Sequence, residues 1–239
     1  MKKILLNFFY IILNIIAGVN LTADSASVPT AAENESASLI VSDDFVSALS
    51  CAKNYDQLIV VSATGSDAVV TMHEKNSGGI WEEIMNTTGY VGKNGVGKAS
   101  ESDTKTPAGD FGFGIAFGIS PNPGTIMDYI QVDDTYYWVD DSSSACYNRF
   151  VTTKDISPQN WNSAEHIIDY PDAYAYVISI DYNSDCIPGA GSAIFLHCSN
   201  GMPTLGCVSI PAEDMVFVLT HIKKGCRIII DTPENLVNY

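Results

Sequence analysis

The chain has 239 residues, and its 12 Lys and Arg residues against 28 Asp and Glu residues give a formal net charge of −16. A field of this sign repels a phosphate backbone, so no nucleic acid is expected as a partner. The length suits one folded domain with extensions, or two small domains.

The first 27 residues have the pattern of a secretory signal peptide. A basic start, Met1-Lys2-Lys3, precedes an apolar run over residues 4–19, and small residues between 21 and 27 suit a cleavage site. A retained N-terminal anchor is the alternative, although the apolar run is slightly short for a membrane span. We expect an exported protein of the cell envelope or extracellular space, with membrane contact only through an uncleaved N-terminal segment.

Residues 28–55 are predicted to be a flexible linker, because Ala, Ser and acidic residues dominate its first part without any apolar period. The folded domain is expected over residues 56–232, followed by a tail at 233–239. Runs of β-branched and aromatic residues within that domain predict strands, and the first three, joined by glycine-bearing turns, predict an antiparallel meander. The predicted strands are 57–62, 67–74, 80–85, 111–117, 136–139, 174–180, 192–197 and 226–230.

One helix is predicted to begin at Pro211 and to end before Gly225. Proline suits the first helical position, and the acidic residues after it favour the positive end of the helix dipole. Apolar residues at positions 215, 218, 219 and 222 give one apolar face. The fold class is therefore mostly β, with one or a few short helices.

The chemistry suggested by the sequence centres on His197 and Cys207. A β-type run ends at His197, and Gly206 precedes the cysteine. A free thiol is mostly protonated at neutral pH, so a nucleophilic cysteine needs a base or a positive field. His197 is the expected base, and the helix at Pro211 would add a positive field if the chain entered it directly. The spacing alone is a weak signal.

The cysteines allow other interpretations. Six in an exported chain would normally indicate three disulfides, but a catalytic Cys207 has to stay free, and the sequence leaves the pairing open. His197, Cys198 and Cys207 are also conceivable zinc ligands, although no Cys-x-x-Cys pair or fourth ligand stands out.

Four segments in order resemble the signature segments of the L,D-transpeptidase (YkuD-like) catalytic domain, and two more look like segments of an exported bacterial branch of that family. The similarity extends from about residue 58 to 230, and the combination is more specific than any single piece. The four are Thr106–Phe111, Ala116–Gly118, Gly191–His197 and Thr204–Val208, and the two are Tyr147-Asn148 and Ser163–His166.

The resemblance implies an L,D-transpeptidase-type, β-sandwich-like domain that acts on peptidoglycan stem peptides without a metal or organic cofactor. Cys207 would attack the bond before the terminal D-alanine and form a thioester, with His197 as base. An amine from a neighbouring stem would then give a 3→3 cross-link. The Cys198 carbonyl would orient the histidine, and the amides of Gly206 and Cys207 would hold the oxyanion.

The family's pattern around the nucleophile is Ser-His-Gly-Cys-Val/Ile-Arg, and this chain departs from it at three positions. Thr204 replaces the serine, Leu205 the histidine and Ser209 the arginine. An arginine can pair with a carboxylate through two hydrogen bonds, which a serine cannot. Two alternatives therefore stand beside transpeptidation: an L,D-carboxypeptidase that uses water as acceptor, and a catalytically silent wall-binding module. Thr204, Glu165 and His166 are candidate substrate contacts, with a structural role on a helix face as the alternative for Glu165 and His166.

Overall fold

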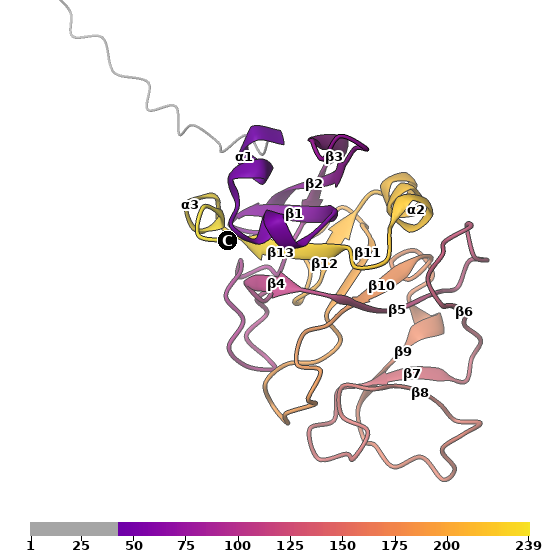
Figure 1. The fold of residues 1–239 in the computed structure, drawn as a ribbon. Helices are drawn as coiled ribbons and strands as arrows, with labels where there is room; N and C mark the ends of the chain where they lie inside the picture. The colour runs from indigo at the N-terminus through magenta and orange to yellow at the C-terminus, as the bar shows by residue number, and fades with distance from the viewer. Residues whose placement is uncertain (1–42) are drawn as a thin grey trace, which may run out of the picture. The chain divides into compact units, whose positions relative to one another are not determined.

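The computed structural model describes residues 43–239, which form mostly β structure with few short helices (Figure 1). The predicted fold class is confirmed in these terms. The predicted signal peptide and the first part of the predicted linker, residues 1–42, lie outside the described residues. The strands are β1 (Gln57–Thr64), β2 (Asp67–Lys75), β3 (Trp81–Tyr90), β4 (Gly109–Phe111), β5 (Phe113–Gly118), β6 (Tyr129–Gln131), β7 (Tyr136–Val139), β8 (Phe150–Thr152), β9 (Ala164–His166), β10 (Val177–Ile180), β11 (Phe195–Cys198), β12 (Val208–Ile210) and β13 (Arg227–Asp231). The helices are α1 (Asp43–Ala48), η1 (Cys51–Asn54), η2 (Ile167–Asp169), α2 (Ala212–His221) and α3 (Pro233–Leu236).

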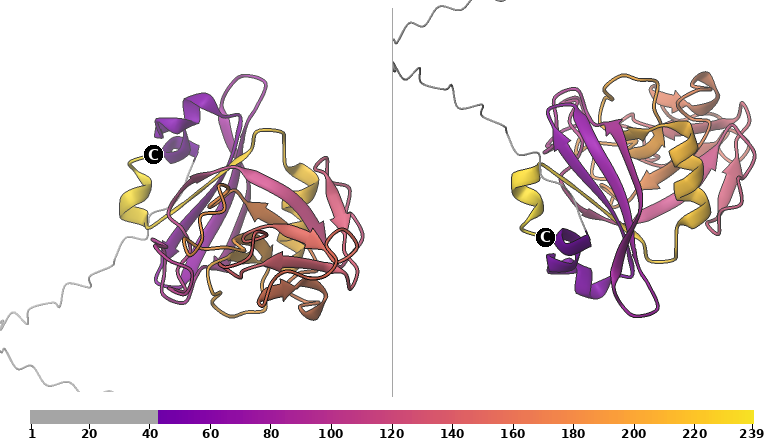
Figure 2. Two further views of the ribbon diagram at one scale, coloured as in Figure 1. Left: turned by 90° about the horizontal axis from the view of Figure 1, so that it is seen from below. Right: turned by 90° about the horizontal axis from the view of Figure 1, so that it is seen from above.

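Ten strands form one curled sheet in the order β4-β13-β1-β2-β3-β12-β11-β10-β5-β6, and β8-β7-β9 form a separate three-stranded sheet. The predicted meander of β1, β2 and β3 is antiparallel throughout. β11 and β12 pair in parallel, as do β1 and β13. Figure 2 shows α2 lying against the concave side of the curled sheet.

Two clusters of buried side chains cover the opposite faces of the central strands. Alternation along β11 and β12 sends Leu196 and Val208 to the α2 side, and Phe195 to the side of the small sheet. Each large apolar side chain buried in this way stabilises the fold by about 1.5–3 kcal/mol. The α2 side holds Leu196, Cys198, Val208, Ile210, Met215, Val218 and Leu219, and the other side holds Phe117, Trp138, Ile167, Tyr174, Val177, Phe195 and Cys207.

The predicted linker and tail are both partly wrong. Residues 43–54 form α1 and η1, and α3 occupies the expected tail. Val46 and Leu236 are fully buried in one cluster with Trp81, and the Cys51 N–H donates to the Tyr239 carbonyl at 2.8 Å. Figure 1 shows α1 and α3 on the same side of the sheet. The short apolar stretch around Val46 has too few turns to give a periodic sequence signal, so only tertiary packing orders it.

Two further expectations are corrected near the site. The strand predicted over 111–117 is broken at Gly112 into β4, which pairs with β13, and β5, which pairs with β10. The predicted helix does not follow Cys207 directly, because β12 intervenes and α2 begins only at Ala212. The positive end of this helix therefore does not supply the field that the sequence suggested for the cysteine.

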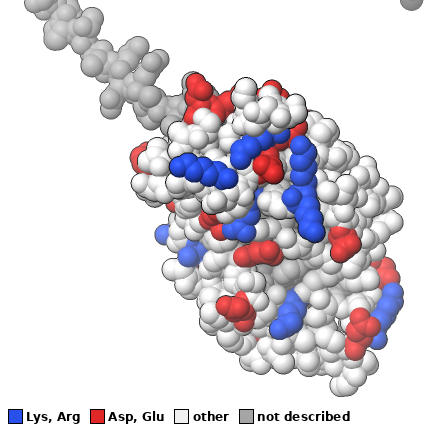
Figure 3. All heavy atoms as spheres, in the orientation of Figure 1, with Lys and Arg blue, Asp and Glu red and all other residues white. Residues whose placement is uncertain are grey.

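No helix within residues 43–239 combines the length and the apolar character that a membrane crossing requires. Lys and Arg side chains on the face shown in Figure 3 are interspersed with Asp and Glu side chains rather than gathered in one basic stretch.

Candidate functional site

The β11–β12 pair brings His197 and Cys207 to the same face of the sheet. The parallel register places His197 opposite Ser209, and Cys207 is two residues before Ser209, so all three positions share a side. Both residues line one cavity with a volume of about 660 Å³. Two distant parts of the chain also reach this cavity, and its charged and aromatic lining includes Lys98, Glu101, Glu165 and Tyr174.

The Cys207 side chain is buried, with 8 % of the residue exposed. Its Sγ donates to the Ala193 carbonyl oxygen at 3.2 Å and accepts from the Phe195 N–H at 3.4 Å. Burial, reinforced by the negative charge of Glu165, raises the pKa of the thiol well above its usual value. The cysteine is therefore a neutral thiol in the resting structure, and its hydrogen bonds point to the backbone rather than to His197.

His197 is equally buried, at 9 % exposed, and burial lowers its pKa to about 4, although the backbone carbonyls of Cys198 and Ala173 oppose the shift. The ring Nδ1 lies 2.9 Å from the Cys198 carbonyl oxygen. Because a carbonyl can only accept, Nδ1 carries the proton and Nε2 keeps a lone pair. The edge of the Tyr174 ring meets the imidazole at 5.6 Å between centroids. A neutral, oriented imidazole is the form that can take a proton.

The expected oxyanion donors are only partly available. The Gly206 N–H already donates to the Thr204 hydroxyl at 3.1 Å, so in this geometry it is not free to donate to an oxyanion. The same hydroxyl donates to the Cys207 carbonyl at 2.7 Å, and the buried Thr106 hydroxyl donates to that carbonyl at 3.0 Å. These bonds fix the backbone of the nucleophile and leave the Cys207 N–H as the remaining backbone candidate.

Glu165 and His166 follow each other on β9 and therefore point to opposite sides. The Glu165 carboxylate lines the cavity and accepts a hydrogen bond from the Tyr174 hydroxyl. Burial raises the pKa of Glu165 to about 7, and the charges of Asp140 and Glu101 act in the same direction. His166 instead bonds Asp169 and the Asp134 carbonyl and stacks on Tyr137, away from the cavity lining. Both residues lie on a strand, so the helix-face alternative is wrong.

The zinc alternative does not fit this arrangement. Cys198 points to the α2 side of the sheet, opposite to His197 and Cys207, and its Sγ lies 3.7 Å from the Tyr176 carbonyl oxygen. Across residues 43–239, no three His, Cys, Asp or Glu side chains are grouped closely enough to hold a metal ion. All six cysteines fall in this range, and each is a free thiol.

Leu205 and Ser209, two of the three positions that depart from the pattern of the L,D-transpeptidase family, lie in different environments. Leu205 is 71 % exposed at the rim of the cavity. Ser209 is buried, and its hydroxyl has no hydrogen-bond partner among the described residues. Neither side chain carries a charge, so neither can pair with a carboxylate as the arginine of the family pattern can.

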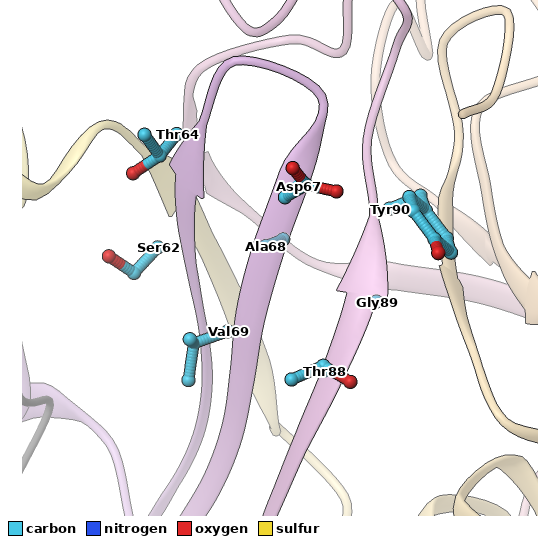
Figure 4. A pocket seen from close by; sticks show the side chains of 8 residues that line it. All are labelled: Ser62, Thr64, Asp67, Ala68, Val69, Thr88, Gly89 and Tyr90. Carbon is cyan, nitrogen blue, oxygen red and sulfur yellow. The ribbon is translucent and has the colours of Figure 1, made fainter. Parts of the chain in front are cut away.

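Several cavity residues carry no recognisable sequence signal. Lys98, Glu101 and Asp140 lie in loops, where no period or motif marks a functional side chain. Tyr174 begins the strand predicted over 174–180, but it lies in the turn before β10. A separate hollow over β1, β2 and β3 has a volume of about 340 Å³ and is lined mainly by small side chains, with Asp67 as its one carboxylate (Figure 4). Its lining holds neither a cysteine nor a histidine.

No family model matches the sequence, and no curated protein matches it. The structure is similar to that of the helical cell shape determining protein Pgp2 from Campylobacter jejuni, with a TM-score of 0.39 and 12 % sequence identity. The match covers 76 % of this chain and 52 % of the Pgp2 chain, so this chain spans about half the length of that protein.

Proposed function

We propose that the chain is an exported acyl-transfer enzyme of the L,D-transpeptidase type, with Cys207 as nucleophile and His197 as base. The observation that carries the proposal is the cavity itself, where a buried thiol and a neutral imidazole lie on one face of adjacent parallel strands. The proposed substrates are peptidoglycan stem peptides, and the proposed location is the cell envelope.

In the acylation step, His197 Nε2 takes the thiol proton as Cys207 Sγ attacks the carbonyl carbon of the scissile amide. A C–S bond forms, and the C=O π pair moves to the oxygen as an oxyanion. When the C=O bond re-forms, the C–N bond breaks, and the departing D-alanine nitrogen takes the proton from the imidazolium. The products are a thioester on Cys207, free D-alanine and neutral His197.

In the second step, an amine of a neighbouring stem attacks the thioester carbon and gives its proton to His197. The new C–N bond forms as the C–S bond breaks, and the thiolate regains the proton. Water in place of the amine gives hydrolysis. The carboxylates of Glu101 and Glu165 give the cavity an acidic lining that suits the amino groups of a stem peptide better than a polyanion.

The test compares wild type with Cys207→Ala on a tetrapeptide stem and measures D-alanine release. We expect release by wild type and none by the variant, with an unchanged circular dichroism spectrum. Cys51→Ala is the matched control, because Cys51 lies in η1, outside the cavity lining. Mass spectrometry after treatment with a carbapenem is expected to show one adduct, on Cys207.

The acceptor is determined by adding an amine donor to the same reaction. A cross-linked product supports transpeptidation, whereas released D-alanine alone selects the carboxypeptidase. Release that persists in Cys207→Ala contradicts the proposal. Binding of wild type to purified peptidoglycan without any product over long incubation selects the silent wall-binding module.

A further inference from the structure

Lys98 is a buried cation in the loop between β3 and β4, and its side chain is only 2 % exposed. Its Nζ lies 2.9 Å from Asp103 Oδ1, and Asp103 itself is 17 % exposed. A buried ammonium loses its hydration, so it is stabilised only where other groups replace the lost water. The position of this charge is therefore specific to the folded structure.

The partner of Lys98 is held rigidly by the backbone. Asp103 accepts hydrogen bonds from the N–H groups of Ala99 at 2.6 Å, Ser100 at 3.0 Å and Lys105 at 3.0 Å. These bonds, with that from Lys98, hold the pKa of Asp103 well below its usual range despite the opposing effect of burial. The ammonium is thus attached to a fixed carboxylate rather than to a mobile one.

The lysine side chain lies against two glycines, Gly206 and Gly191. A Cβ built on Gly206 would lie 3.5 Å from Lys98 Nζ, and a Cβ built on Gly191 would lie 2.7 Å from Lys98 Cε. Gly206 immediately precedes Cys207, and Lys98 and Cys207 line the same cavity. The positive charge of Lys98 also acts to lower the pKa of the Cys207 thiol, against the larger effect of burial.

The ammonium has donors to spare. It carries three N–H groups, and among the described residues only Asp103 accepts from it. The Lys98 ammonium is buried and has two unused donors. It can therefore stabilise an oxygen atom that becomes negative during the reaction. Gly206 cannot supply that donor, because its N–H is already bonded to Thr204.

We propose that Lys98 is a catalytic residue whose ammonium donates to the acyl carbonyl oxygen on Cys207 as that oxygen becomes an oxyanion. The inference rests on the proposed function, because it requires an acyl group on Cys207. Lys98 and the Cys207 N–H then share the negative charge, and the lysine stays protonated throughout the step. This cation lies in a loop more than a hundred positions before Cys207, whereas the arginine of the family pattern comes two positions after the cysteine.

The test uses p-nitrophenyl acetate, a neutral ester that carries no carboxylate. Acetylation of Cys207 releases p-nitrophenolate, and the adduct mass verifies the site. The variants are Lys98→Met, which removes the charge, and Lys98→Gln, which keeps a neutral donor. Lys98→Arg keeps the charge, and Lys93→Met removes an exposed lysine from the same loop. Alkylation by iodoacetamide is measured in parallel, because it needs the thiolate but forms no oxyanion.

We expect Lys98→Met to slow acetylation by about 10²- to 10³-fold, the usual loss for one oxyanion donor. The slowing of alkylation is expected to be much smaller. Lys98→Gln and Lys98→Arg should both fall between Lys98→Met and wild type, while Lys93→Met should stay near wild type. Melting temperatures identify any variant that fails to fold, and Lys98→Gln then provides the comparison.

Other outcomes overturn the proposal in distinguishable ways. Equal slowing of both reactions shows that Lys98 acts only on the thiolate. Unchanged acetylation combined with a raised KM for a stem peptide shows that the ammonium binds a substrate carboxylate instead. If wild type acetylates normally and all Lys98 variants match it, the inference about Lys98 fails alone. If wild type is never acylated at Cys207, the proposed function fails with it.

Discussion

The Cys207 thiol donates a hydrogen bond to the carbonyl oxygen of Ala193, a residue held at a φ of +53°. Non-glycine residues rarely adopt this conformation, so surrounding bonds have to impose it. The Ala193 N–H donates to Asn148 Oδ1 at 3.1 Å, and Asn148 is fixed in turn by Trp138 Nε1 at 2.9 Å and by the Asn183 carbonyl at 2.9 Å. The Tyr147-Asn148 segment therefore positions the backbone behind the nucleophile.

Replacing Asn148 tests this relationship. Asn148 has a φ of +56°, which glycine adopts freely, so Asn148→Gly removes the side-chain bonds without adding backbone strain. We expect kcat for D-alanine release to fall by about tenfold, with KM little changed, and the free energy of unfolding to fall by about 1–3 kcal/mol. A variant that loses stability but keeps the wild-type kcat would show that Asn148 serves the fold alone.

His197 should shift the acid limit of activity. Its lowered pKa of about 4 keeps the imidazole neutral and able to accept a proton far below the usual histidine range near 6.5. We expect the acid limb of kcat/KM to have its midpoint near pH 4. A pH profile measured from 3.5 to 8 on a stem peptide checks this, and a midpoint near 6.5 would contradict a buried, neutral base.

The same residue should make stability depend on pH. Below pH 6.5 the unfolded chain protonates this histidine, while the folded chain does not until about pH 4, so the unfolded state binds more protons. The contribution of His197 is therefore fully present above pH 6.5 and is lost progressively down to pH 4, by about 3 kcal/mol in total. Urea unfolding of wild type and His197→Gln at pH 6.5 and at pH 4 measures this contribution. An equal loss of unfolding free energy in the two proteins between these pH values would refute it.

Glu165 should slow the alkylation of the Cys207 thiol at high pH. Its charge raises the pKa of Cys207, and its own pKa of about 7 means that this charge is present only above neutrality. We expect Glu165→Gln to speed iodoacetamide alkylation by about threefold to tenfold at pH 8 and hardly at all at pH 5. Glu213→Gln, at an exposed position of α2, is the control. Equal acceleration at both pH values would rule out an effect of charge.

Gly89 should be needed where β3 meets β12. A Cβ at this position would lie 2.2 Å from the Ser209 carbonyl oxygen, which belongs to the backbone and cannot rotate away. We expect Gly89→Ala to lower the free energy of unfolding by about 1–3 kcal/mol or more. Gly78→Ala meets only the Asn76 side chain and should have a much smaller effect in the same urea titration. Equal stability of the two variants would disprove the close approach.

The positions of the longer strands could be foreseen largely from residues that act locally. β-branched runs and glycine turns predicted β1 to β3 and the positions of β7, β11 and β13, because alternation and turn chemistry depend on near neighbours in the chain. The short strands β6, β8, β9 and β12 were missed. Three-residue strands have no period of their own, and only pairing with a neighbouring strand defines them.

The sequence by itself determined that the domain is mostly β, and it marked His197 and Cys207 as a candidate base and a candidate nucleophile. Only the tertiary structure decided what surrounds them. It turned Cys198 to the opposite face, occupied the Gly206 amide with Thr204, and placed Lys98, Glu101 and Glu165 around the thiol. The physical reason is that burial and charge depend on distances between segments far apart in the chain, which no local pattern encodes.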